Sequence, residues 1–190
     1  MPELEAVLAR IDADMDAALE RLFAVLRLKS ISTDPAYAAD CQACADWHTA
    51  DLKSIGFEAA SRPTPGHPIV VGHDRTASGP SVLFYGHYDV QPVDPLELWE
   101  FDPFDPRIQV RADGSKAIRA RGASDDKGQV MTFVEALRAW KAVTGRLPIP
   151  VSLVLEGEEE SGGVNLPPFL KAHADELRAD IGLICDTSMW

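Results

Sequence analysis

The sequence predicts an α/β protein of three layers, in which a mostly parallel, mixed β-sheet lies between two layers of helices. The first observation is a set of short, predominantly apolar runs, as strands are when helices cover both faces of a sheet. These runs are residues 81–85 (SVLFY), 151–155 (VSLVL) and 181–185 (IGLIC). The second observation is that helical segments alternate with these runs, which favours parallel strands. The length of 190 residues suits a single domain.

Four segments carry apolar residues at the three- and four-residue steps of an amphipathic helix. They are residues 3–28, 38–55, 128–143 and 166–178. In the second segment, one face is expected to be buried: Cys41, Cys44, Ala45, His48, Leu52 and Ile55. Cysteine and histidine are also zinc ligands, but there is no second Cys pair and this face is apolar, so core packing is the favoured interpretation. Gly56 and Gly145 follow the second and third segments, where glycine commonly ends a helix.

The segments between the helices carry strand and turn signals. A short strand is expected at residues 69–71, and a hairpin at residues 108–120, where Asp113 and Gly114 supply the turn. Residues 91–106 contain four prolines and are expected to form an ordered loop.

The composition excludes several classes of protein. Lysine and arginine number 18 against 30 aspartates and glutamates, a net charge of −12 that argues against binding to nucleic acid or to anionic membranes. No run of 18 apolar residues predicts a membrane span. The first residues are acidic and amphipathic, unlike a secretory signal. Three cysteines are too few for a disulfide framework, so a cytoplasmic location is expected.

Side chains that bind metals follow each of the three buried runs. His87 and Asp89 follow the first, the acidic residues 158–160 follow the second, and Asp186 follows the third. Sites in open α/β sheets form beyond the carboxyl ends of the strands, so these side chains are expected to converge. Asp125 and Asp126 precede the helix at 128–143 and are expected to join them.

Many carboxylates in one place repel one another and raise each other's pKa unless a positive charge lies between them. A divalent cation would supply that charge, and one imidazole with several carboxylates suits zinc, with Mn²⁺ or Co²⁺ as alternatives. The number of carboxylates favours two ions bridged by one of them. Taken singly, each residue also has a structural interpretation: a helix cap for Asp125 or Asp126, a solvated loop for residues 158–160, a hydrogen-bonded histidine for His87 and a turn residue for Asp186.

Three stretches resemble the signatures of a known enzyme family. They are residues 86–92 (GHYDVQP), 121–128 (RGASDDKG) and 156–162 (EGEEESG). The family is that of the co-catalytic zinc metallopeptidases, which includes aminoacylase, carboxypeptidase G, succinyl-diaminopimelate desuccinylase and carnosinase-type dipeptidases. The sequence after His87 and Asp89, with Trp99 and Phe104 further along, resembles the dipeptidase branch most.

The resemblance implies roles for individual residues. Two zinc ions would be held by four ligands: His87, Asp125, Glu160 and Asp186. Asp125 would bridge the two ions, and Asp89 would orient His87. Glu159 would be the general base, although Glu158 leaves a shift of one residue open. The resemblance also implies that the peptide bond between Asp125 and Asp126 is cis.

The resemblance further implies that residues 1–190 are the N-terminal segment of a catalytic domain. Members of the family are longer, and their later residues form a lid and dimerisation domain, the rest of the catalytic domain and the last histidine ligand. The parent protein is therefore expected to be a homodimer, and the chain alone is expected to be weakly active or inactive, with its second metal loosely held.

The expected activity is hydrolysis of the peptide bond of dipeptides. An N-acyl-amino-acid deacylase or desuccinylase of the same family is the alternative enzyme, so the substrate would be a small peptide or an N-acyl amino acid. A metal-binding fragment without catalysis, and an acidic α/β domain without a metal, are the further alternatives.

Overall fold

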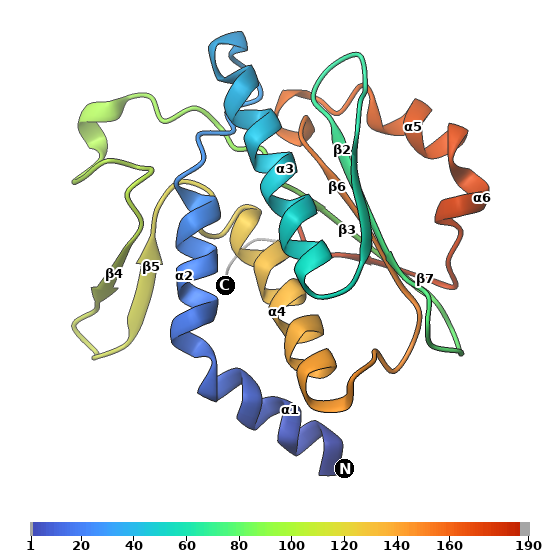
Figure 1. Cartoon of the computed structure of the whole chain (residues 1–190). Helices are drawn as coiled ribbons and strands as arrows, with labels where there is room; N and C mark the ends of the chain where they lie inside the picture. The colour runs from blue at the N-terminus through green and yellow to red at the C-terminus, as the bar shows by residue number, and fades with distance from the viewer. Residues whose placement is uncertain (1, 187–190) are drawn as a thin grey trace.

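The computed structural model describes residues 2–186 and contains a five-stranded sheet between two helical layers (Figure 1). In spatial order the strands are β1 (Glu58–Arg62), β2 (Ile69–Asp74), β6 (Val151–Glu156), β3 (Val82–His87) and β7 (Ile181–Ile184). Strand β3 runs parallel to β6 and to β7, whereas β1–β2 and β2–β6 are antiparallel pairs. The sheet is mixed, as predicted, and its parallel part consists of β6, β3 and β7.

The strand register brings three chain segments out at one edge of the sheet. His87 at the end of β3 is paired with Glu156 at the end of β6, and Tyr85 is paired with Ile184 at the end of β7. Because these strands are parallel, the residues that follow them leave the sheet at the same edge. The sequence pattern and the register therefore place the expected ligands together.

Apolar side chains alternate between the two faces of the sheet and fill two separate cores. The first core lies on one face of the sheet. It contains Val70, Leu153 and Leu155 together with residues of α3 (Ala38–Ser54) and α4 (Lys127–Thr144). Their neighbours in β2 and β6 pack instead with Leu177 and residues of α5 (Leu166–Ala172). Figure 1 shows α3 and α4 on one side of the sheet and α5 and α6 (Ala174–Leu177) on the other. The three-layer prediction is confirmed.

Helix α3 buries the face that its apolar spacing predicts. Cys41, Cys44 and His48 are at most 1% exposed, and Leu52 and Ile55 also lie in the core. The Cys44 thiol faces the Tyr88 carbonyl oxygen at 3.8 Å. The cysteine–histidine set of this helix is therefore part of the hydrophobic core.

The predicted helix at residues 3–28 is wrong in one respect, because two helices occupy that range. They are α1 (Pro2–Ala13) and α2 (Met15–Leu26), separated at Asp14, whose carboxylate accepts a hydrogen bond from Arg10 Nε at 2.5 Å. Aspartate is a poor residue for a helix interior, since its side chain competes for local hydrogen bonds. The break redirects the chain so that both helices contact α4. Figure 1 shows the change of direction between them.

The predicted helix at residues 166–178 is likewise two helices, α5 and α6, separated at His173. The His173 ring packs on Phe169 with a centroid distance of 4.4 Å, and its Nδ1 lies 3.4 Å from the Glu176 carboxylate. These contacts hold His173 at the corner between the two helices.

The prediction that residues 181–185 form a buried strand is half correct. The strand β7 exists, but Ile181, Leu183 and Ile184 are 49%, 37% and 65% exposed. Within residues 2–186, β7 is one of the two edge strands of the sheet, and no helix of that range covers these side chains. Burial of a strand depends on its place in the sheet, and a local apolar run does not specify that place.

Strand β1 was not predicted, and β3 is only partly buried, whereas the other remaining elements agree with the sequence analysis. Strands β4 (Arg107–Val110) and β5 (Lys116–Arg119) form the expected hairpin, and Gly114 in its turn has a φ of +84°. Residues 91–106 form a loop that contains the short 3₁₀ helix η2 (Leu96–Leu98). None of the helices in residues 2–186 combines the length and apolar character that a membrane span needs.

Candidate metal centre

His87 lies at the centre of the candidate site, at the carboxyl end of β3. Its side chain is fully buried, and Nε2 lies 3.0 Å from Oδ1 of Asp125. The other ring nitrogen, Nδ1, lies 3.1 Å from the carbonyl oxygen of Asp89 and 3.3 Å from its carboxylate. Both nitrogens therefore have fixed environments, and Nε2 is the one directed at the cluster of carboxylates.

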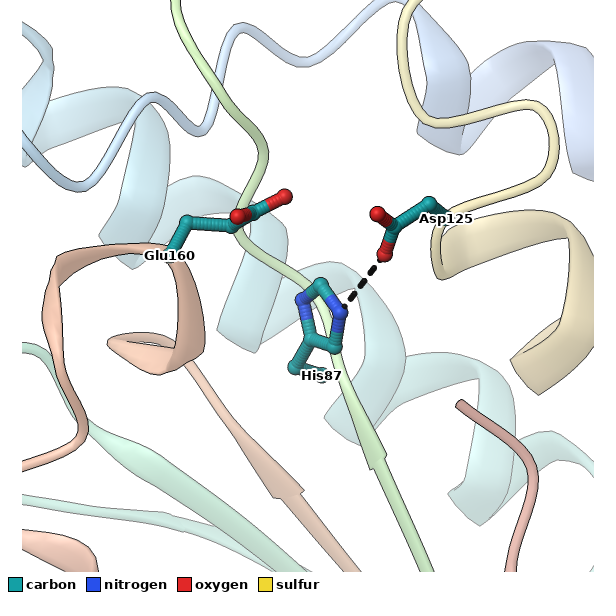
Figure 2. A group of neighbouring side chains, drawn as sticks. All are labelled: His87, Asp125 and Glu160. Carbon is teal, nitrogen blue, oxygen red and sulfur yellow. Dashed lines mark hydrogen bonds and ion pairs between the residues drawn. The ribbon is translucent and has the colours of Figure 1, made fainter. Parts of the chain in front are cut away.

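Two overlapping groups of side chains have the geometry to hold a metal ion. One is His87, Asp125 and Glu160, and the other is His87, Glu159 and Asp186. In each group the potential ligand atoms lie within 4.8 Å of one another. Figure 2 shows the carboxylates of Asp125 and Glu160 on either side of the His87 ring. The structure thus brings together the residues that the sequence places at three strand ends and at the start of α4.

Asp89 connects His87 to the loop that carries the glutamates. Its buried carboxylate faces His87 Nδ1 and accepts hydrogen bonds from the backbone N–H groups of Glu159 (3.2 Å) and Glu160 (3.0 Å). The hydroxyl of Ser32 donates to the same carboxylate at 2.5 Å. Asp89 therefore fixes both the imidazole and the short helix η3 (Glu159–Ser161).

Glu158 points away from this centre. Its Oε2 accepts a hydrogen bond from Asn165 Nδ2 at 2.6 Å, and it belongs to neither candidate group. Glu159 Oε2 lies 4.0 Å from His87 Nε2, and Glu160 accepts a hydrogen bond from Gln91 at 2.5 Å. This geometry favours the register in which Glu159 and Glu160 serve the site.

The bond between Asp125 and Asp126 is cis, as the resemblance implies. The buried Asp126 carboxylate accepts a hydrogen bond from the His87 backbone N–H at 3.0 Å, and burial raises the pKa of Asp126 to about 7. A β-carbon on Gly86 would lie 2.8 Å from that carboxylate, so glycine is needed for the approach. Asp126 was expected to join the site together with Asp125, but its bond to the His87 backbone was not predicted.

Negative charge dominates the site. Burial lowers the pKa of His87, but the carboxylates of Asp89, Asp126 and Asp125 outweigh this effect and raise it to about 10. Burial and neighbouring carboxylates raise the pKa of Glu159 and of Glu160. A divalent cation would relieve this repulsion.

The lysine nearest to these residues in the sequence does not serve the cluster. Lys127 is fully buried, and its ammonium group donates hydrogen bonds to the carbonyl oxygens of Val25 (3.1 Å) and Leu28 (2.7 Å) at the end of α2. One imidazole nitrogen and several carboxylate oxygens are donors that suit zinc, manganese or cobalt. The residues present therefore fit a divalent transition metal.

Comparisons with known proteins identify relatives of this chain. The Cys-Gly metallodipeptidase dug1 of Schizosaccharomyces pombe is 28% identical over 186 residues, which cover 92% of this chain and 38% of that protein. The human Beta-Ala-His dipeptidase is 31% identical over 137 residues, covering 70% of this chain and 25% of that protein. These alignments leave most of each relative's length outside this chain.

Solved structures of dipeptidases also match this chain. Human carnosine dipeptidase 1 matches with a TM-score of 0.88 and 27% identity, over 98% of this chain and 41% of that one. The dipeptidase Dug1p of Saccharomyces cerevisiae matches with a TM-score of 0.86 and 25% identity, over 98% of this chain and 42% of that one. The chain spans about two fifths of the length of these proteins. The model of peptidase family M20/M25/M40 matches residues 83–190, and the chain therefore belongs to that family.

Proposed function

We propose that the protein hydrolyses the peptide bond of dipeptides at a centre that holds two divalent metal ions, with zinc as the favoured metal and Mn²⁺ or Co²⁺ as alternatives. The observation that carries the proposal is that two groups of potential ligands share the buried His87. Dipeptides are the favoured substrates because the relatives reported above are named as dipeptidases. All three cysteines are free thiols, which suits the cytoplasmic location that we propose.

In the proposed site, His87, Asp125 and Asp186 would hold one ion, and Asp125 and Glu160 would hold the second. Bound ions would polarise the scissile carbonyl group and make the attacking water more acidic. Asp89 keeps His87 Nε2 directed at the cluster through its contacts with Nδ1.

Glu159 is the proposed general base. It lies beside His87 and belongs to the second candidate group. Its carboxylate takes a proton from the attacking water while the oxygen bonds to the carbonyl carbon. Cleavage of the C–N bond then releases the amine, which receives that proton from Glu159. The products are two amino acids.

Metal binding is tested by titrating the metal-free chain with Zn²⁺ in competition with a chromophoric chelator. We expect uptake by the wild-type chain, and its loss or strong weakening in His87→Ala. Glu158→Gln is the matched control. Because Glu158 accepts a hydrogen bond from Asn165 and does not face His87, this substitution should leave the Zn²⁺ affinity unchanged. A wild-type chain without affinity for Zn²⁺, Mn²⁺ and Co²⁺ would contradict the proposal.

The base is tested by Glu159→Gln in the complete gene product, with dipeptides and N-acyl amino acids as substrates. The variant should retain its metal, because glutamine keeps the shape of the side chain, and should lose about 10²-fold or more in kcat. Turnover at the wild-type rate would refute the assignment. Faster cleavage of N-acyl amino acids than of dipeptides would favour the deacylase alternative.

A further inference from the structure

We infer that Ser32 is a positioning residue of the metal centre, acting through Asp89 on the backbone of Glu160; this inference rests on the proposed function. The hydroxyl of Ser32 donates to Oδ2 of Asp89 at 2.5 Å, across 57 positions of sequence. None of the three signature stretches contains Ser32.

The four contacts of the Asp89 carboxylate divide between its two oxygen atoms. Oδ1 faces His87 Nδ1 at 3.3 Å and accepts from the Glu159 N–H at 3.2 Å. Oδ2 accepts from the Glu160 N–H at 3.0 Å and from Ser32 Oγ. Ser32 is thus the only one of these four donors that lies outside the strand-end cluster, and it shares its acceptor atom with Glu160.

The backbone around Ser32 is held beside the end of β3. Ser30 Oγ donates to the Tyr88 carbonyl oxygen at 2.7 Å, and the Val90 N–H donates to the Ser30 carbonyl oxygen at 2.9 Å. Ile31 forms a parallel bridge with Val90. Residues 30–32 therefore run alongside residues 88–90, and this pairing directs the Ser32 hydroxyl at Asp89.

Two further contacts fix this segment. Before it, the buried ammonium group of Lys127 bonds to the Leu28 carbonyl oxygen at 2.7 Å. At its last residue, the Ser32 carbonyl oxygen lies 3.2 Å from His67 Nε2. Because Ser32 is held from both sides, its hydroxyl is a preorganised donor.

The position of this donor predicts which half of the centre depends on it. A buried carboxylate oxygen that loses one of two donors is less well compensated, and it becomes free to reorient. Oδ2 would then release the Glu160 backbone, whereas the contacts of Oδ1 with His87 and Glu159 would remain. Ser32 therefore holds Glu160 in place for its ion, without contacting that ion.

The test uses Ser32→Ala and the control Ser54→Ala, which removes a hydroxyl that bonds to the Asp51 carbonyl oxygen and to Arg138, away from Asp89. NMR of the metal-free chain measures the hydrogen-exchange rates of the Glu159 and Glu160 backbone amides. Ser32→Ala should accelerate exchange at Glu160 about tenfold and affect Glu159 less. Ser54→Ala should leave the Glu160 amide at the wild-type rate.

The second measurement is Zn²⁺ affinity by chelator competition. Ser32→Ala should lower the affinity for the second, more weakly bound Zn²⁺ ion about tenfold. Loss of a residue that orients a metal ligand typically has an effect of this size. Ser32→Thr keeps a hydroxyl and should restore both readouts. Ser32→Cys, which keeps the size and offers only a weak S–H donor, should weaken both and replaces the alanine variant if that one does not fold.

Two results would overturn the inference: wild-type values in both Ser32→Ala and Ser32→Cys, or equal effects of Ser54→Ala and Ser32→Ala. The outcomes also separate this inference from the proposed function. If the wild-type chain takes up no metal, the proposed function fails, and the exchange rates of the Glu160 amide still decide the role of Ser32.

Discussion

At the scale of single residues, buried polar groups in this chain are held by specific partners or remain uncharged. Asp89 and Lys127 show the first solution, because each buried charge bonds to several atoms of fixed position. His48 shows the second. It is 1% exposed, and no residue in the described part of the chain hydrogen-bonds to its Nε2. Burial and the nearby Lys127 lower the pKa of His48 to about 3.

The state of His48 predicts how stability changes with pH. The folded state keeps His48 neutral down to pH about 3, whereas the unfolded chain binds a proton near pH 6.5. The stability contribution of this group is thus complete above pH 6.5 and is lost as the pH falls from 6.5 toward 3. The loss amounts to about 1.4 kcal/mol per pH unit.

Denaturant unfolding of the wild-type chain and of His48→Leu at pH 6.5 and pH 5 measures this effect. The wild type should lose about 2 kcal/mol more than the variant, because leucine does not titrate. Comparison with the variant cancels the contributions of the other titrating groups. Equal losses in the two proteins would show that His48 is not the group responsible.

At the scale of elements, the Glu176 carboxylate links the short helix α6 to two strands of the sheet. Glu176 accepts two hydrogen bonds from the Arg62 guanidinium group in β1, at 2.8 and 2.5 Å, and lies 2.9 Å from His73 Nε2 in β2. The hydrogen bonds from Arg62 lower the pKa of Glu176 to about 2, against the opposing effect of burial. Helices of four and seven residues need such contacts, because they are too short to be stable alone.

Glu176→Gln should therefore destabilise the attachment of α5 and α6. We expect a loss of about 1 kcal/mol at pH 7, a modest value because the side chain is 30% exposed. The depressed pKa means that this contribution is present above pH about 4.5 and is lost as the pH falls toward 2. Hydrogen exchange of residues 166–177 measures the effect.

Asp175→Asn is the control for this experiment, because its fully exposed carboxylate meets only Arg178 at 3.6 Å. That variant should exchange at the wild-type rate. Unchanged exchange of residues 166–177 in Glu176→Gln would mean that apolar packing alone holds these helices.

At the scale of the whole molecule, the described residues provide more carboxylates than nitrogen ligands. Both candidate groups share His87, whose Nδ1 is occupied by Asp89, so Nε2 can serve only one ion. A second ion would have only carboxylate ligands from residues 2–186, including the 62% exposed Asp125. We expect one tight and one weaker Zn²⁺ site in the chain of 190 residues.

This imbalance predicts low activity for the isolated chain. An exposed, incompletely coordinated ion stabilises the transition state poorly, because water is not excluded from the site. Dipeptide hydrolysis by the 190-residue chain should be slow or undetectable beside that of a full-length dipeptidase of the family, at equal concentration and with saturating Zn²⁺. Robust hydrolysis by the isolated chain would contradict this prediction.

The sequence could predict most elements, because each buried run and each amphipathic helix carries its own local pattern. The strand-end rule also predicted that His87, residues 158–160 and Asp186 lie in one neighbourhood. Asp125 was expected to join them from the start of the helix α4. The failures occurred where local pattern was insufficient. Asp14 and His173 divide helices whose apolar spacing continues across them. The exposure of β7 depends on its position at the edge of the sheet.

The sequence by itself determined the α/β class, the strand ends that carry metal-binding side chains and the family to which the signatures belong. Those properties follow from the order and periodicity of residues along the chain. Only the tertiary structure decided that Glu158 turns to Asn165 while Glu159 and Glu160 face His87, and that Ser32 reaches Asp89. Contacts between segments distant in sequence fix these orientations, and no local periodicity encodes them.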